Sequence, residues 1–129
     1  MININTILVP FVDSPSAIGA LKTAIAISKI NHSKLVVIHV VNDKTPENLL
    51  ETVKNICGPE NALFTFMERS GNISREIIKA EKECSANLII MGAYGLTGWQ
   101  QFWVGSNAFK VISTSHCPVI TLQNDVGTF

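Results

Sequence analysis

The residues from 87 to 107, NLIIMGAYGLTGWQQFWVGSN, have the types and spacing that a phosphate-binding loop requires. The apolar run Leu88–Met91 is typical of a buried strand, and it passes abruptly into the glycines Gly92 and Gly95. Glycine lets the backbone approach a ligand closely. Gly105-Ser106 then precedes an amphipathic stretch, so we expect it at the start of a helix, where free amides, a hydroxyl and the helix dipole favour an anion.

The spacing Gly92-x2-Gly95-x9-Gly105-Ser106 matches neither a Walker A loop nor GxGxxG. A purely structural loop is the alternative, because glycines serve turns as readily as ligands. Within the nine-residue spacer, the segment Trp99–Trp103, WQQFW, either stacks on a base or packs the loop onto the protein or a second subunit.

No catalytic set stands out elsewhere in the sequence. His39 lies inside an apolar run and is predicted to be a core or edge residue, while His116 and Cys117 are neighbours that would point in opposite directions. No lysine or arginine occurs between Gly92 and Asn107, so slow ATP hydrolysis is the most that we expect. Asp13 is a candidate ligand for Mg²⁺ beside a phosphate.

Strand patterns alternate with helix patterns along the whole chain, which predicts a parallel sheet with helices on both faces. We expect one doubly wound α/β domain over residues 1–129, with five strands in the flavodoxin-like order 3-2-1-4-5. The order reverses between the first and fourth strands, where ligands bind in such sheets. The predicted strands are Thr6–Val12, Lys34–Val41, Ala62–Met67, Asn87–Met91 and Pro118–Leu122, and the predicted helices are Ala17–Ile30, Glu47–Ile56, Ile73–Cys84 and Ala108–Ser115.

The composition limits the possible partners. Of the 129 residues 47% are hydrophobic and only 16% are charged, with a formal net charge of zero, which argues against a nucleic-acid-binding surface. The longest apolar run, Leu35–Val41, is too short for a membrane span of about 20 residues. MININTILVP lacks the basic start of a signal peptide. Three scattered cysteines indicate free thiols and a cytoplasmic protein.

The sequence resembles the universal stress protein family, in the branch that binds ATP, over nearly its whole length. The resemblance rests on the glycine and serine spacing and on five further segments, which are Ile7–Pro10, Val37–Val40, Gly71–Ile73, Ala86–Gly92 and Cys117–Ile120. It implies a fold like that of the adenine nucleotide alpha hydrolases and a dimeric stress-response sensor or regulator that holds ATP, ADP or AMP. The alternative is a family member that has lost the nucleotide and works as a dimeric protein-interaction module. The nucleotide contacts that the resemblance implies are Pro10, Phe11, Val40, Met91, Gly92, Gly95, Gly105, Ser106 and Asn107.

The sequence departs from the family pattern after the first strand. The family commonly has Pro-x-Asp-x-Ser there, whereas this chain has Val12 at the Asp position and Asp13 one place later. One place along an extended segment turns a side chain to the other face. We therefore include Val12 and Asp13 in the candidate site and expect weaker or less base-selective binding.

The last predicted strand, Pro118–Leu122, would be an edge of the sheet with no charged side chain to prevent pairing. A homodimer through this strand is expected, and the resemblance implies the same dimer.

Overall fold

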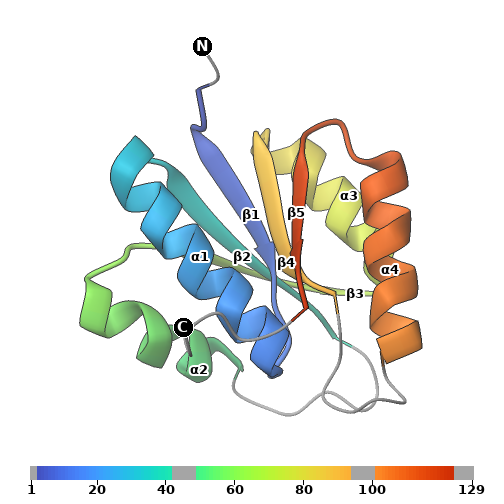
Figure 1. Cartoon of the computed structure of the whole chain (residues 1–129), viewed down its shortest axis with the longest axis horizontal. Coiled ribbons are helices and arrows are strands. Elements are labelled where there is room, and N and C mark those ends of the chain that lie inside the picture. Colours follow the sequence, from blue (N-terminus) through green and yellow to red (C-terminus); the bar gives the residue numbers. More distant parts are fainter. Residues whose placement is uncertain (1–2, 42–48, 94–100, 124–129) are drawn as a thin grey trace.

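The computed structural model is a five-stranded parallel sheet with helices on both faces (Figure 1). It describes residues 3–41, 49–93 and 101–123, of which 101–105 are described as backbone only. The strand order is β3-β2-β1-β4-β5, as predicted. In chain order the elements are β1 (Thr6–Pro10), α1 (Pro15–Asn31), β2 (Lys34–Val41), α2 (Leu49–Cys57), the 3₁₀ helix η1 (Gly58–Glu60), β3 (Thr65–Ser70), α3 (Ile73–Cys84), β4 (Leu88–Gly92), α4 (Gln101–Thr114) and β5 (Val119–Leu122).

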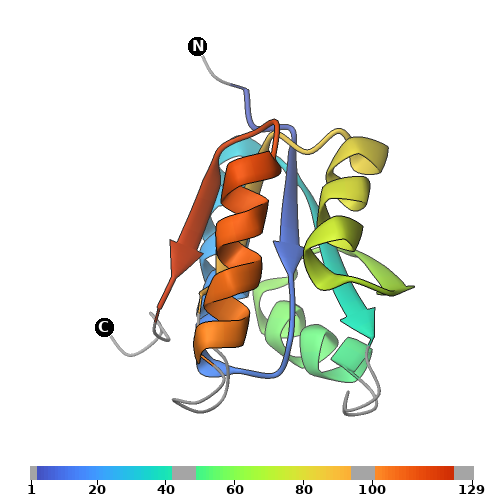
Figure 2. The same ribbon diagram turned by 90° about the vertical axis from the view of Figure 1, so that its right-hand side faces the viewer.

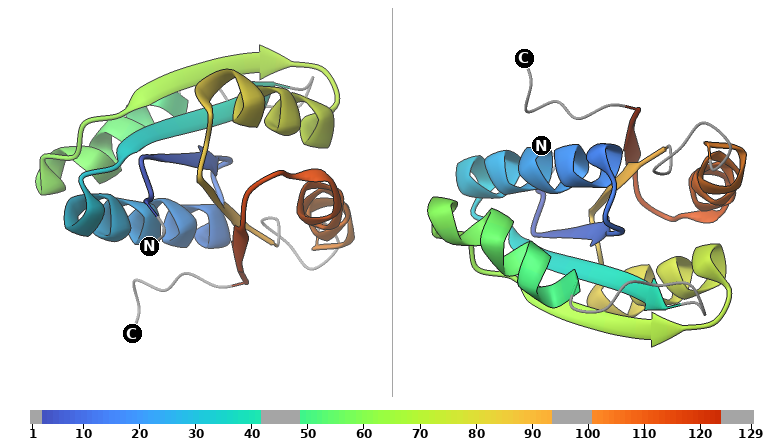
Figure 3. Two further views of the ribbon diagram at one scale, coloured as in Figure 1. Left: turned by 90° about the horizontal axis from the view of Figure 1, so that it is seen from above. Right: turned by 90° about the horizontal axis from the view of Figure 1, so that it is seen from below.

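Two buried clusters fill the space between the sheet and its helices. One joins β1 and β2 to α1 and α2 and includes Ile7, Val9 and Leu21, and the other joins the opposite face to α3 and α4. Figure 2 shows α4 in front of the sheet with α3 beside it, and the end-on views in Figure 3 show how strongly the sheet twists. The helices thus form one layer on each side of the sheet.

Local signals in the sequence fix the ends of two helices. The Ser14 side chain accepts a hydrogen bond from the Ala17 amide at 3.2 Å and caps α1, with Pro15 at the first helical position. Asn72 caps α3 in the same way, by accepting from the Arg75 amide at 3.0 Å. Both caps place a helix N-terminus beside the carboxyl end of a strand.

Several predicted boundaries are wrong. β1 ends at Pro10 rather than Val12, and β3 ends at Ser70 rather than Met67. β3 begins at Thr65 rather than Ala62, because the Ala62 amide donates to the Cys57 carbonyl and closes the turn after α2. α4 begins at Gln101 rather than Ala108, because a helix tolerates an internal glycine at a cost of about 1 kcal/mol.

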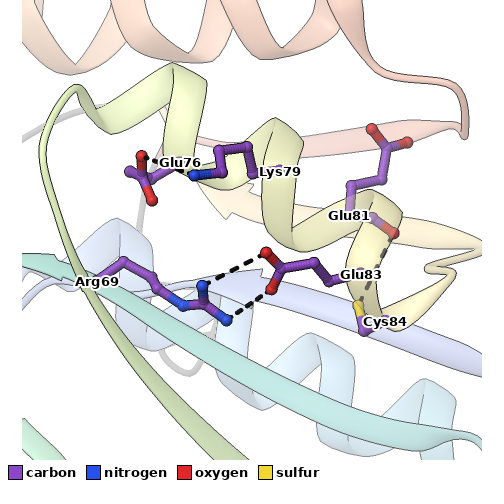
Figure 4. Close-up of polar contacts among 6 residues, drawn as sticks. All are labelled: Arg69, Glu76, Lys79, Glu81, Glu83 and Cys84. Carbon is purple, nitrogen blue, oxygen red and sulfur yellow. Dashed lines mark hydrogen bonds and ion pairs between the residues drawn. The ribbon is translucent and has the colours of Figure 1, made fainter.

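Ion pairs on the surface join neighbouring elements. Arg69 on β3 makes a two-pronged contact with Glu83 on α3, with nitrogen–oxygen distances of 2.6 and 3.4 Å (Figure 4). Lys79 and Glu76 lie 3.9 Å apart on α3. Both pairs are partly exposed to solvent, so they add little stability.

Candidate functional site

The candidate site lies at the β1–β4 junction, by which we mean the carboxyl ends of β1 (Val9, Pro10) and β4 (Ile90 to Gly92). The recorded pairs between these strands are Ile7–Leu88 and Leu8–Ile89 only. The neighbouring ladders run further, since β4 stays paired with β5 as far as Gly92–Leu122. The central strands therefore part at the point where the strand order reverses, which is where ligands bind in open α/β sheets.

Pro10 gives a physical reason for the end of this ladder. On β1 the even-numbered residues face β4, since the Thr6 carbonyl accepts from the Asn87 amide, whereas the Phe11 amide donates to Ile38 on β2. In this register the next hydrogen bond would run from the residue 10 amide to the Ile90 carbonyl. Proline has no amide hydrogen, so the bond cannot form.

The predicted contact residues divide between the two faces of the sheet. Val40 and Met91 belong to the buried cluster under α3 and α4, and Pro10 shares their face because it lies two places after Leu8. Phe11 belongs to the cluster under α1. Phe11 is only 2% exposed, and its amide and carbonyl are both hydrogen-bonded within the protein, to Ile38 and His39.

Gly92 lies against the first turn of α1. A β-carbon there would lie 2.7 Å from the Ala17 nitrogen and 2.8 Å from the Ser16 carbonyl carbon. Only a glycine fits this approach of strand to helix. Packing alone therefore accounts for the glycine at position 92, whether or not a ligand binds beside it.

The N-terminus of α1 offers few donors to an anion. Pro15 has no N–H, the Ala17 amide donates to the Ser14 side chain, and the Ile18 amide donates to the Ser14 carbonyl. Val12 and Asp13 are exposed on the turn before this helix. The Asp13 carboxylate is thus accessible and has the oxygen chemistry that Mg²⁺ prefers.

The expected phosphate end is described only in part. Gly95, Gly98 and Trp99 lie outside the described residues. Stacking of the tryptophans on a base therefore stays a prediction. Gly105 and Ser106 do not start a helix as predicted but lie in the second turn of α4, which begins at Gln101. In a helix with these bounds the helical amides without an intrahelical partner belong to residues 101–103, so the free amide donors of α4 precede the Gly-Ser pair.

His39 occupies a place that sequence reasoning assigned to the core without further role. Its ring is buried, and Nδ1 lies 3.0 Å from the carbonyl oxygen of Phe11, which is the first residue after β1. Its other ring nitrogen, Nε2, is buried and has no hydrogen-bond partner in the described part of the chain. A histidine that breaks an apolar strand pattern was the signal for this position.

Glu81 is a second buried polar residue, at the opposite end of the sheet. Its Oε2 accepts hydrogen bonds from the amides of His116 at 2.7 Å and Cys117 at 2.9 Å, just before β5. The carboxylate extends from α3 toward that segment, while the backbone carbonyl of the same residue accepts from the Cys84 thiol (Figure 4). Glu81 lies four places after Ile77 on the inward-facing side of α3. This spacing is the feature of the sequence that could have predicted a buried glutamate.

The surroundings of the thiols disfavour their ionised form. Burial, followed by the hydrogen bond to Glu81 and the charge of that carboxylate, raises the pKa of Cys117 to about 12. Burial also raises the pKa of the Cys57 and Cys84 thiols. These cysteines therefore lack the thiolate character of a nucleophile.

Two further features are absent from the described residues. Within residues 3–41, 49–93 and 101–123, no group of three or more His, Cys, Asp or Glu side chains could hold a metal ion. In the same part of the chain no helix has both the length and the apolar character needed to cross a bilayer.

The parallel sheet of order β3-β2-β1-β4-β5 with helices on both faces places the protein in the class of doubly wound α/β domains. The model of the universal stress protein family matches residues 54–123, more than half of the chain. The protein therefore belongs to the universal stress protein family. Universal stress protein YxiE of Bacillus subtilis is 25% identical, over 92% of this chain and 99% of that protein.

Solved structures share the fold. A universal stress protein from Archaeoglobus fulgidus is 26% identical with a TM-score of 0.79, and the match covers 95% of this chain but 45% of that chain, so this protein spans about half of that relative's length. A universal stress protein from the same organism, solved in complex with dAMP, is 19% identical with a TM-score of 0.70, covering 95% of this chain and 100% of that chain. At that identity the likeness shows the fold alone.

Proposed function

We propose that this protein binds ATP or a related adenine nucleotide at the β1–β4 junction and acts as a sensor or regulator in a stress response. The observation that carries the proposal is the end of the β1–β4 ladder at Leu8–Ile89, imposed by Pro10. The ladder ends at the reversal point of the sheet, which is where ligands bind in open α/β sheets. The structure of a family member with dAMP supports an adenine nucleotide as the ligand class.

The proposed contacts follow from the position of these residues at the carboxyl ends of the strands. Pro10, Val40 and Met91 share one face beside the junction and would contact the nucleoside, with Phe11 beside them at the end of β1. The phosphates would lie along Gly92 and Gly95 and reach toward α4. There they would contact Gly105, Ser106 and Asn107, which lie in the second turn of this helix. Asp13 would hold Mg²⁺ on a phosphate oxygen, where the ion would neutralise phosphate charge.

Binding at equilibrium tests the proposal. Nucleotide-stripped protein is titrated with ATP, ADP and AMP by calorimetry, and mass spectrometry identifies any small molecule that the natively purified protein carries. We expect adenine nucleotide to bind, with an affinity lowered by the absence of the usual aspartate at position 12. No binding at millimolar ATP would refute the proposal.

An interaction module is the second candidate, and the exposed face of α4 favours it. Phe109 is 69% exposed and Ile112 is 50% exposed on this helix, and Ile120 on β5 is also exposed. Large apolar side chains that remain exposed near one edge are typical of protein contacts. A dimer through β5, in the cytoplasm, is part of both proposals; a dimer that binds no nucleotide would favour this one.

A further inference from the structure

The last bond between β1 and β2 is made by a side chain. The Phe11 amide donates to the Ile38 carbonyl at 2.8 Å, which continues the parallel ladder beyond the end of β1. In this register the Phe11 carbonyl would next accept from the Val40 amide. In the described structure its partner is instead Nδ1 of His39, at 3.0 Å.

The contact determines which ring nitrogen carries the proton. A carbonyl oxygen can only accept a hydrogen bond, so the hydrogen of a neutral His39 lies on Nδ1. Nε2 is then an acceptor, and it is buried without a partner among the described residues. The ring therefore makes one specific hydrogen bond, to the segment that leads into Val12 and Asp13.

The change of hydrogen-bond partner at the Phe11 carbonyl affects the amide of Val40. Backbone groups alternate sides along a strand, and the Ile38 carbonyl faces β1, so the amide and carbonyl of Val40 face the same side, beyond the last ladder bond. The Phe11 carbonyl is directed to the His39 ring, and no hydrogen bond from the Val40 amide to this carbonyl is present in the described structure. A ligand at the carboxyl ends of these strands would find a donor there.

We propose that His39 is a positioning residue of the nucleotide site, which holds the Phe11 carbonyl and so keeps the Val40 amide available to a ring nitrogen of the nucleobase. The inference rests on the proposed function, because it assigns a role within that site. His39 does not touch the ligand in this arrangement. It acts through the backbone that forms the nucleoside end of the site.

Two substitutions separate this role from simple packing. His39→Leu removes the donor, so the Phe11 carbonyl should return to the Val40 amide. ATP affinity should then fall by about tenfold, the usual effect of one lost hydrogen bond. His39→Asn places an amide nitrogen near the position of Nδ1 and should keep the affinity within about threefold of wild type. Inorganic tripolyphosphate, which has no base, should bind both variants like wild type.

Nuclear magnetic resonance of the ligand-free protein tests the positioning itself. Nitrogen-15 shifts should show the proton of His39 on Nδ1, and hydrogen exchange of the Val40 amide should be slower in His39→Leu than in wild type. A proton on Nε2, or a folded His39→Leu with unchanged ATP affinity, would overturn the inference. Failure of wild type to bind ATP would instead refute the proposed function, while the proton position and amide exchange still decide the role of His39. If His39→Leu does not fold, the ATP affinity of His39→Asn and the proton position on the wild-type His39 ring decide the role of His39.

Discussion

Gly92 at the end of β4 lies so close to Ala17 in the first turn of α1 that a β-carbon on the glycine would be 2.7 Å from the Ala17 nitrogen. The contact is with backbone, which cannot move aside as a flexible side chain would. Gly92→Ala should therefore lower the free energy of unfolding by about 1–3 kcal/mol, as other overpacked sites do. Urea denaturation measures the change.

Gly58→Ala is the matched control for this substitution, since a β-carbon at Gly58 would meet nothing within 4 Å. It should leave the urea midpoint near the wild-type value. Equal effects of the two alanine substitutions would show that the close approach at Gly92 is not what limits this position.

Val12→Asp should tighten ATP binding. The Val12 side chain is 41% exposed on the turn after β1, so a carboxylate there keeps much of its hydration. A charge-assisted hydrogen bond of about 1.5–3 kcal/mol to the nucleotide would raise the affinity roughly ten- to a hundredfold. Calorimetry with ATP measures it, and Val12→Asn controls for size without charge. If Asp13 already supplies this contact, Asp13→Ala will weaken binding and Val12→Asp will add nothing, contrary to our expectation.

Glu81→Ala should be strongly destabilising. The substitution removes the acceptor of two amides, those of His116 and Cys117. Leaving a buried donor unpaired costs about 1–3 kcal/mol, and because these two hydrogen bonds are only partly buried we expect a total loss of about 1–4 kcal/mol in thermal or urea unfolding. Glu83→Ala, which breaks only the partly exposed pair with Arg69, should change stability by less than about 1 kcal/mol. A larger effect of Glu83→Ala would contradict this ranking.

The Cys117 thiol should resist alkylation in the folded protein and should make stability depend on alkaline pH. Its pKa is about 12 in the folded state against 9.0 for an ordinary thiol, so folding favours the protonated form. The resulting stabilisation is complete below about pH 9 and is lost as the pH rises from 9 toward 12. Iodoacetamide labelling at pH 8, followed by mass spectrometry, should modify Cys117 far more slowly than in urea. Rapid labelling of the folded protein would show that the thiol ionises readily.

The proposed dimer predicts opposite effects at the two edges of the sheet. On β5 the amide of Thr121 points away from β4, because Pro118 and the other even-numbered positions face that strand. Thr121→Pro should therefore prevent pairing of two β5 edges and give a monomer in light scattering. Glu68→Pro removes an outward amide from the other edge strand, β3, and should leave the dimer intact. A wild-type monomer at micromolar concentration would dispose of the dimer altogether.

The strand order and two elements could be predicted from the sequence because their signals are local. β2 has the predicted bounds since Lys34–Val41 is a nearly continuous apolar run, and α3 has its predicted bounds since Asn72 caps it. The start of β3 depends instead on its register with Val36 on β2, and the start of α4 on how far a helix continues through a glycine. Neither start is determined by the residues of the segment alone.

The polar contacts that define the site could be predicted only in part. Met91 could be placed near the carboxyl end of its strand from composition, whereas the sequence predicts that the first strand continues two residues past Pro10. The partner of the Phe11 carbonyl lies 28 positions away on His39, and the partners of Glu81 are backbone amides, which every residue carries. Such pairs depend on how the strands and helices assemble.

The proline at the end of β1 has one more consequence. Because its nitrogen is substituted, no rearrangement of the backbone can supply the missing hydrogen, so the bond to Ile90 stays unformed whether or not a ligand is present. A ligand would then enter without breaking a hydrogen bond between β1 and β4 at this point. Its association should proceed in a single kinetic phase, and the observed rate constant should rise linearly with ligand concentration.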